Sequence, residues 1–348
     1  MIPNLPRPVI WRPKGFVPSL EQLNSTHGLL ARGDVAAAVQ IPGDAPHPLS
    51  VVELAEGRIV GSVRLVVTRN GIAVGRLQAL IGCNEPQKHY QLRNPRFRLL
   101  RRRPGVALLL GIPESSNYFH WLLNSAPRWK LLEAAGQTKA YDYVLLNDSA
   151  PPFQDETLDR MGIPPSKRLR CSTHSLLQFE RLVVPDMPLP RCRVPGWACA
   201  WVRSLFPERD PNAPKLLYVS RRTASRRRLA NELEVEPHLK KLGFAIVQPE
   251  RLGLVEQVKL FSAAKCIVAP HGAGLTNIVF APPGAHLVEL CHPDAEASTY
   301  RELVPVCGLR YSRLNGRPNG SPKTADFTIA VPELLKALQA TTSWTPLG

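Results

Sequence analysis

Residues 269–277 contain the residue types of an anion-binding turn. They follow an apolar run that predicts a buried strand, and they lead into a run that predicts a short helix. Gly272 and Gly274 let the backbone turn sharply and approach a ligand closely. The first N–H groups of a helix have no acceptor within it and, with the helix dipole, attract anions. We therefore predict a bound diphosphate, although tight packing of a strand against a helix would use the same glycines. The predicted contacts are His271, Gly272, Ala273, Gly274, Thr276 and Asn277.

A second segment, residues 218–228, is rich in arginine. Five of the eight residues in 221–228 are arginine, and their charges repel one another unless anions lie nearby. The segment leaves the end of a predicted strand, where open α/β sheets bind ligands. We predict that Ser220, Arg221 and Arg226 contact a diphosphate, with the two guanidinium groups making bidentate, charge-assisted hydrogen bonds. A solvated basic loop and a nucleic-acid-binding patch are the alternatives.

A third segment, residues 117–128, carries a histidine at helical spacing from two polar residues. His120, Asn124 and Arg128 recur every four residues and would share one face of a helix. An imidazole beside a substrate hydroxyl can act as a general base. We predict His120 and Asn124 as catalytic candidates, although a lone histidine is more often a structural hydrogen-bonding residue.

Glu289 lies near the end of an apolar run, residues 286–290, that predicts another strand. A carboxylate at this point of an α/β sheet can accept hydrogen bonds from ribose hydroxyls, as acidic residues do in dinucleotide-binding folds. We therefore predict a contact between Glu289 and the nucleotide. A salt bridge to a nearby arginine is the alternative.

The elements that must position these residues alternate between strands and helices from residue 106 onward. Short continuous apolar runs predict buried parallel strands, and apolar residues at helical spacing predict helices. Such alternation predicts βαβ units with parallel sheets, which is the α/β class. The predicted strands are 106–110, 143–146, 179–184, 216–219, 244–247, 266–269 and 286–290, and the predicted helices are 121–135, 155–161, 237–242, 254–264, 275–280 and 331–340.

Two proline-rich regions differ from this pattern. Residues 1–100 contain many prolines and short apolar runs, with a hairpin predicted around residues 69–71. The prolines of residues 185–214 predict a junction between domains. We therefore predict an N-terminal domain over 1–195, β-rich at first and then βαβ, and a C-terminal Rossmann-like domain over 196–348.

Composition restricts the partners and the compartment. The chain has 44 Lys and Arg against 28 Asp and Glu, a net charge of +16, which favours anionic partners such as nucleotides, acidic glycans or an anionic membrane face. Its seven cysteines include no C-x-x-C pair, so a disulfide framework or zinc site is not expected and a reducing cytoplasm is favoured. The N-terminus lacks the apolar core of a signal peptide, and no apolar run reaches the ~18 residues that span a bilayer. We expect a cytoplasmic protein whose membrane contact, at the inner face, would be peripheral.

Taken together, these segments resemble glycosyltransferase family 61 over about residues 105–310, most strongly over 216–290. The matching stretches are NYFHWLLNSAPR, then YVSRR followed by SRRRLANELEV, then PHGAGLTN followed by FAPPGA. Their order and spacing agree with the family's pattern. The combination of the last two stretches is more specific than any of its glycines alone.

The resemblance implies a GT-B-like architecture, in which two Rossmann-like domains face each other across a cleft. The N-terminal domain would bind the acceptor and the C-terminal domain the nucleotide sugar. The family's enzymes are inverting and metal-independent, and they use the nucleotide sugar as co-substrate without a further cofactor. Arg221, Arg226 and the helix start at 274–277 match the family's donor site and would stabilise the leaving diphosphate. Consistently, the chain has no Asp-x-Asp pair for a divalent ion.

Inversion at the anomeric carbon also requires a base that deprotonates the acceptor hydroxyl. His120 is our candidate for that base. Many family members carry a carboxylate where this chain has Asn124, so the resemblance leaves the assignment open, with Asp148 and Asp155 as alternatives.

The sequence thus favours a glycosyltransferase that transfers a sugar from a nucleotide sugar, with UDP preferred as the carrier, to a glycan or lipid-linked glycan in surface (capsular) polysaccharide biosynthesis. Two other readings stay open. Asn124 is compatible with a catalytically weak, glycan-binding homologue, and residues 221–228 are compatible with a nucleic-acid-binding protein. Residues 221–228 lack the interleaved aromatic residues that stack on bases, so no nucleic-acid partner is expected.

Overall fold

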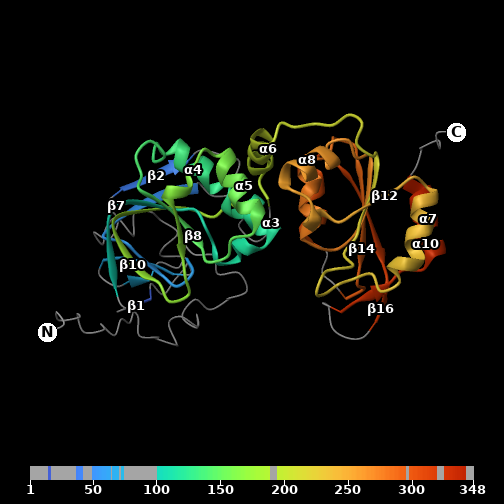
Figure 1. Ribbon diagram of the computed structural model, residues 1–348, viewed down its shortest axis with the longest axis horizontal. Helices are drawn as coiled ribbons and strands as arrows, with labels where there is room; N and C mark the ends of the chain where they lie inside the picture. Colours follow the sequence, from blue (N-terminus) through green and yellow to red (C-terminus); the bar gives the residue numbers. More distant parts are fainter. Residues whose placement is uncertain are drawn as a thin grey trace. The chain divides into compact units, whose positions relative to one another are not determined.

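The chain forms two compact units, Met1–Pro190 and Arg191–Gly348, each with its own sheet (Figure 1). The computed structural model describes residues 15–16, 37–41, 49–63, 65–69, 72–73, 100–188, 194–294, 298–319 and 325–341. The sequence predicts the boundary at 195/196, and the acceptor and donor roles of the two parts stay predictions.

The first unit contains a mixed sheet with the order β1-β6-β5-β4-β10-β7-β8-β9, in which β3 also pairs with β10 and β2. β10, β7, β8 and β9 run parallel to their neighbours in this series, whereas β3 and β4 pair with β10 antiparallel. β5 and β6 pair antiparallel as the predicted hairpin requires, and its turn residues 70–71 lie outside the described residues. The strands are β1 (Gly15–Phe16), β2 (Ala37–Ile41), β3 (Leu49–Ala55), β4 (Arg58–Val60), β5 (Leu65–Val67), β6 (Ile72–Ala73), β7 (Arg101–Leu109), β8 (Tyr143–Asn147), β9 (Arg168–Cys171) and β10 (Leu176–Pro185).

The helix predicted over 121–135 is interrupted in the structure. A short α3 (Tyr118–His120) passes into one π-helical turn, η4 (Trp121–Ser125), before α4 (Arg128–Ala134). Pro127 has no N–H to donate to the preceding turn, and the Ala126 N–H bonds the Trp121 carbonyl at 2.8 Å, five residues back. The interruption lies at Pro127, the residue expected to kink or break this helix, and the π-helical turn changes the regular four-residue spacing expected of His120, Asn124 and Arg128. The remaining helices of this unit are η3 (Pro113–Ser116), α5 (Pro152–Arg160) and η5 (Pro165–Lys167).

The second unit contains a fully parallel sheet with the order β12-β11-β13-β14-β15. In chain order within the unit this is 2-1-3-4-5, a doubly wound α/β arrangement. The α/β class with parallel strands is therefore confirmed, while a two-domain arrangement about a cleft stays a prediction. The strands are β11 (Leu216–Val219), β12 (Ala245–Val247), β13 (Cys266–Pro270), β14 (His286–Cys291) and β15 (Arg310–Asn315), followed by a small pair, β16 (Arg317–Pro318) and β17 (Phe327–Thr328).

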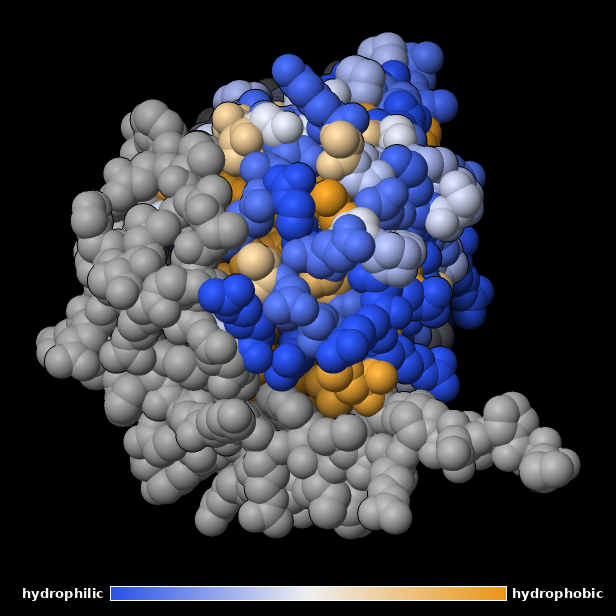
Figure 2. Space-filling view, turned by 90° about the vertical axis from the view of Figure 1, so that its left-hand side faces the viewer, coloured by the Kyte–Doolittle hydropathy of each residue, from blue (hydrophilic) through white to orange (hydrophobic). Residues whose placement is uncertain are grey.

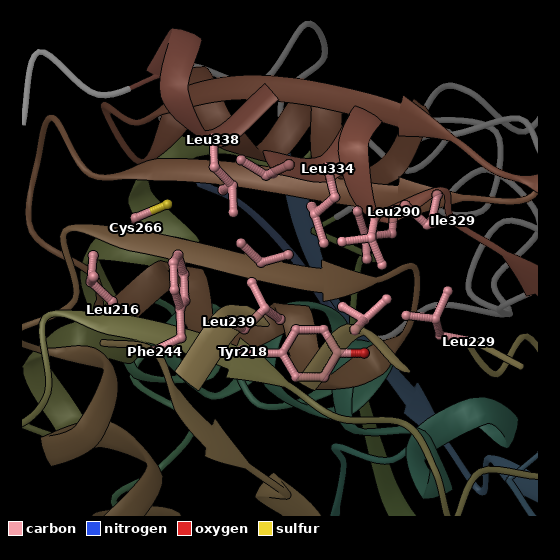
Figure 3. Packing of buried hydrophobic residues seen from close by; sticks show 14 of the residues in the cluster. Leu216, Tyr218, Leu229, Leu239, Phe244, Cys266, Leu290, Ile329, Leu334 and Leu338 are labelled. Carbon is pink, nitrogen blue, oxygen red and sulfur yellow. The ribbon is translucent and has the colours of Figure 1, made fainter. Parts of the chain in front are cut away.

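Helices cover both faces of this second sheet (Figure 1). On one face, α7 (Glu232–Lys241) and α10 (Val331–Thr341) bury apolar residues against alternate residues of the strands, including Leu239, Leu334 and Leu338 (Figure 3). The alternation follows from the strand pleat, which sends successive side chains to opposite faces. α8 lies on the other face. The remaining helices are α6 (Gly196–Leu205), η7 (Pro249–Arg251), α8 (Leu254–Phe261), η8 (Ala273–Phe280) and α9 (Ser298–Val306).

α7 begins earlier than the sequence predicts. The sequence places Pro237 in the first turn of a helix over 237–242, but the helix starts at Glu232 and Pro237 lies inside it. The carbonyl that loses its hydrogen bond to Pro237 belongs to Leu233, a residue that is 73% exposed. Solvent can satisfy that carbonyl, so the helix tolerates the proline.

The described residues on the face shown in Figure 2 are mainly hydrophilic at the surface, with smaller hydrophobic areas between them. Arg101, Arg102 and Arg103, at the start of β7, are exposed and contribute to the positive charge of the first unit. Within the part of the chain that the structure describes, no helix is both long enough and apolar enough to cross a membrane.

Two leucines of α7 provide a test of the second core. Leu239 is fully buried in that core, whereas Leu233 on the same helix is exposed. Leu239→Ala is expected to lower the free energy of unfolding by about 2–5 kcal/mol, because it removes buried methyl groups and leaves a cavity. Leu233→Ala, the matched control, should change it by less than about 0.5 kcal/mol. Urea denaturation of both variants measures the difference, and equal effects would contradict this packing of α7.

Candidate functional site

The two ligand-binding segments predicted from the sequence meet at one point of the second sheet. β11 and β13 are neighbours, and the chain leaves β11 toward β12 on one side and β13 toward β14 on the other. In open α/β sheets, ligands bind at the carboxyl ends of the strands where the strand order reverses in this way. Residues 220–228 leave the end of β11, and His271 and Gly272 leave the end of β13.

The side chain of Arg221 lies directly on the backbone of Gly272. A Cβ atom added at Gly272 would lie 1.8 Å from Nη1 and 2.3 Å from Cζ of Arg221. Gly272 has φ 172°, an extended conformation open to any residue, so the close approach of the guanidinium is what requires glycine. Nη2 of Arg221 donates to the carbonyl of Arg226 at 3.2 Å, and its buried Nε has no hydrogen-bond partner among the described residues.

Two of the five arginines in residues 221–228 are neutralised by carboxylates. Arg222 pairs with Glu232 and Glu236 of α7, and Arg228 donates two hydrogen bonds to Asp326, from Nε at 2.9 Å and from Nη2 at 2.7 Å. For the other three, Arg221, Arg226 and Arg227, the described residues contain no carboxylate ion-pair partner. The excess positive charge of this loop is thus concentrated on three side chains.

Arg227 is a site residue that the sequence analysis missed. It has φ 56°, in the left-handed region that non-glycine residues seldom adopt, and its buried Nε has no partner in the described structure. Burial lowers the pKa of Arg227, the charge of Arg226 lowers it further, and the charges of Tyr300, Glu289 and Cys291 oppose that shift. Arg227 therefore lies near Tyr300 and the end of β14. Nothing in five closely spaced arginines distinguishes it from Arg226.

Arg221 and Arg227 lie close enough to repel each other. Burial lowers the pKa of Arg221, and Arg227 is the largest charged contributor to that shift. Two partly buried guanidinium groups with unpartnered Nε atoms are costly unless an anion binds between them. Arg226, by contrast, is exposed, and its backbone carbonyl accepts the hydrogen bond from Arg221.

Backbone donors lie at the same point. The N–H groups of Ala273 and Gly274, at the start of η8, have no acceptor among the described residues. Such groups at a helix start are suited to an anion. Asn277 is fully buried and donates to Gln257 at 2.7 Å and to the Gly274 carbonyl at 3.2 Å. Thr276 is fully buried beside Tyr300, and its Oγ1 has no hydrogen-bond partner in the described structure.

The remaining predicted donor-site residues have protein partners. Ser220 is buried, and its hydroxyl donates to Glu232. Nδ1 of His271 lies 2.5 Å from Oε1 of Glu289, and the hydroxyl of Tyr311 donates to Oε2 at 2.7 Å. Glu289 is fully buried and each of its oxygens has a protein partner, and its contact with a ribose stays a prediction.

The first unit places His120 and Asn124 around its π-helical turn. His120 is partly buried, its Nδ1 is buried without a partner in the described structure, and burial lowers its pKa. Asn124 is 3% exposed, and its Oδ1 also has no partner among those residues. Single π-helical turns are frequent at functional sites. Unsatisfied buried atoms of this kind suit a ligand or water.

Arg128 has a structural role instead. It is 1% exposed and donates to the carbonyls of Leu110 and Gly111, each at 3.2 Å, and of Pro185 at 2.7 Å. It therefore ties together the ends of β7 and β10. Burial lowers the pKa of Arg128 to about 9, and the nearby charge of Asp186 opposes the shift.

The two alternative carboxylates are both engaged. Asp148 accepts a hydrogen bond from the Ser62 hydroxyl at 2.6 Å. Asp155 pairs with Arg168 at 3.2 Å and with Arg170 at 3.0 Å. Among the described residues, no group of three or more His, Cys, Asp or Glu side chains is arranged to hold a metal ion.

Comparison with known proteins matches the region that contains both sets of residues. The family model described as glycosyltransferase 61 matches residues 118–288. A curated relative, the EGF domain-specific O-linked N-acetylglucosamine transferase of Drosophila melanogaster, is 33% identical over 100 residues, which is 28% of this chain and 19% of the relative. The matched part thus spans about a fifth of that relative's length.

The contact between Arg221 and Gly272 is testable with one methyl group. Gly272→Ala is expected to displace the Arg221 guanidinium and to weaken binding of a nucleoside diphosphate such as UDP by about tenfold to a hundredfold, the loss of a charge-assisted hydrogen bond. Thermal stability should change little, because the backbone at 272 is extended. Gly196→Ala is the control, since its added Cβ would have no atom within 4 Å. Calorimetric titration measures both, and unchanged binding in Gly272→Ala would contradict the role of this contact.

Proposed function

We propose that this chain transfers a sugar from a nucleotide sugar to a glycan acceptor, because the glycosyltransferase 61 family model matches residues 118–288. The observation that carries the proposal is the pair of partly buried arginines, Arg221 and Arg227, without carboxylate partners among the described residues at the switch point of a parallel sheet. The diphosphate of a nucleotide sugar has the charge and length to bridge two guanidinium groups.

In this proposal the second unit binds the donor. Arg221, Arg227 and the N–H groups of Ala273 and Gly274 hold the diphosphate and stabilise the charge that develops on it as the sugar leaves. Fixed positive groups can stabilise a leaving diphosphate without a metal ion, so we propose a metal-independent reaction. Arg226 lies at the solvent side of the same loop and contributes long-range attraction.

The first unit binds the acceptor in this proposal, as in a GT-B architecture. Burial lowers the pKa of His120, so its imidazole is neutral at pH 7 and can accept the proton of an acceptor hydroxyl. A single displacement assisted by this base inverts the anomeric carbon. The buried amide of Asn124, with an unpartnered Oδ1, is placed to orient a hydroxyl or a water beside the π-helical turn.

The donor sugar is proposed from the relative. Its name describes transfer of N-acetylglucosamine, which makes UDP-N-acetylglucosamine the first donor to test. The acceptor is proposed to be a glycan or lipid-linked glycan in surface polysaccharide assembly. The basic surface would favour a peripheral contact with an anionic membrane.

Turnover in the presence of EDTA tests the proposed activity. The purified chain is expected to release UDP from a UDP-sugar, by transfer or slow hydrolysis, with EDTA present. Arg221→Ala and Arg227→Ala should each weaken UDP binding by about tenfold to a hundredfold, whereas Arg317→Ala, which alters an exposed arginine of β16, should not. The proposal would be contradicted if the chain showed no turnover and no nucleotide binding across a donor panel. It would also be contradicted if RNA outcompeted UDP at physiological salt.

His120→Gln tests the base. It is expected to lower kcat by about 10²–10⁴-fold, because general-base catalysis acts on the chemical step, while UDP affinity is retained. The wild-type kcat should stay constant above pH 7 and fall only below the ordinary histidine pKa, since burial holds the pKa of His120 below that value. His174→Gln, an exposed histidine of the same unit, is the control. An unchanged kcat in His120→Gln would exclude this residue as the base.

A further inference from the structure

Glu289 is a carboxylate enclosed by the protein and satisfied by two side chains from different elements. Its side chain has no solvent exposure. Oε1 lies 2.5 Å from Nδ1 of His271, the residue that follows β13, and Oε2 accepts the hydroxyl of Tyr311 on β15 at 2.7 Å. A buried carboxylate is costly and persists only where its oxygens are well hydrogen-bonded. This arrangement therefore requires a donor on each oxygen.

The proton positions of this group follow from its surroundings. Burial and then the charge of Glu289 raise the pKa of Tyr311, so its hydroxyl stays protonated and donates to Oε2. Oε1 then needs its donor from His271, which places a proton on Nδ1. The other ring nitrogen, Nε2, has no partner among the described residues and is not buried.

The imidazole is also held from the side. The rings of His271 and Tyr300 contact edge to face, with centroids 5.4 Å apart. The hydroxyl of Tyr300 donates to the carbonyl of Gly272 at 2.7 Å, the same glycine on which Arg221 lies. The orientation of His271 and the backbone at the diphosphate site are therefore fixed by one connected set of contacts.

We propose that Glu289 and Tyr311 are positioning residues that act through His271, holding its ring so that Nε2 faces the diphosphate of the donor. The proposal rests on the proposed function, and it replaces the direct ribose contact that the sequence predicts for Glu289. A ligating imidazole oriented by a carboxylate is a common device, because the carboxylate fixes both the tautomer and the ring plane.

The two roles of Glu289 differ in the ligands they affect. A ribose contact would matter for UDP but not for inorganic pyrophosphate, which has no ribose. A positioning role through His271 acts on the diphosphate, so it should affect both ligands by the same factor. Calorimetric titration of UDP and of inorganic pyrophosphate into the full chain separates the two.

Glu289→Gln is expected to weaken both ligands about tenfold to a hundredfold, the loss of a hydrogen bond to a charged group. Tyr311→Phe, which leaves the ring in place, should weaken both by about twofold to tenfold. In a His271→Ala background, Glu289→Gln should cause no further loss, because residues that act as one unit are not additive. Glu333→Gln, at an exposed position of α10, is the matched control.

Several outcomes would overturn the inference. Weaker UDP binding with unchanged pyrophosphate binding would assign Glu289 to the ribose, and a further loss in the His271→Ala background would assign it a structural role. If Glu289→Gln does not fold, Tyr311→Phe carries the same comparison, and unchanged affinities in it would reject the proposal. A wild-type chain that binds neither ligand would overturn the proposed donor site itself, whereas wild-type binding with unaffected variants would overturn this inference alone.

Discussion

The central constraint on the candidate site is positive charge that the described part of the second unit leaves without carboxylate partners. Arg221 and Arg227 are partly buried at the end of β11, repel each other, and have unpartnered Nε atoms. Repulsion between desolvated guanidinium groups is unfavourable unless an anion lies nearby. Glu289, fully buried near Arg227, opposes part of that cost, but both its oxygens already accept hydrogen bonds. We propose that a bound anion offsets the remaining cost.

Other residues of the second unit neutralise some of the arginines in 221–228 and hold the others in place. Carboxylates of α7 and Asp326 neutralise Arg222 and Arg228, so the arginine-rich loop is anchored at two points and charged between them. The strand order brings this loop beside the residues that follow β13. Gly272 lacks the side chain that would exclude the Arg221 guanidinium, and Tyr300 fixes the carbonyl of the same residue. Together these features place the guanidinium groups of Arg221 and Arg227 and the N–H groups of residues 273 and 274 at the same end of the sheet.

The first unit also contains buried polar atoms without partners among the described residues, on His120 and Asn124. Pro127 interrupts the helix and leaves a π-helical turn, and the buried Arg128 binds three carbonyls at the ends of β7 and β10. The turn is therefore held in place by strong contacts on its C-terminal side. Local departures from regular structure with unsatisfied polar atoms are expected at functional sites rather than in a purely structural core.

The sequence alone determined the α/β class and most strands of the second unit. It also singled out residues 220–228 and 269–277 as candidate ligand-binding segments. These features depend on local signals: apolar runs, helical spacing, glycine and closely spaced arginine. It did not determine which arginines are available. That depends on carboxylates at Glu232, Glu236 and Asp326, which only the folded chain brings to the loop. The hydrogen-bond partners of Glu289 depend on the fold in the same way, because one of them, Tyr311, lies on the adjacent β15. Burial and contacts between distant residues determine which of these charged groups have partners. Neither can be deduced from one segment of the sequence.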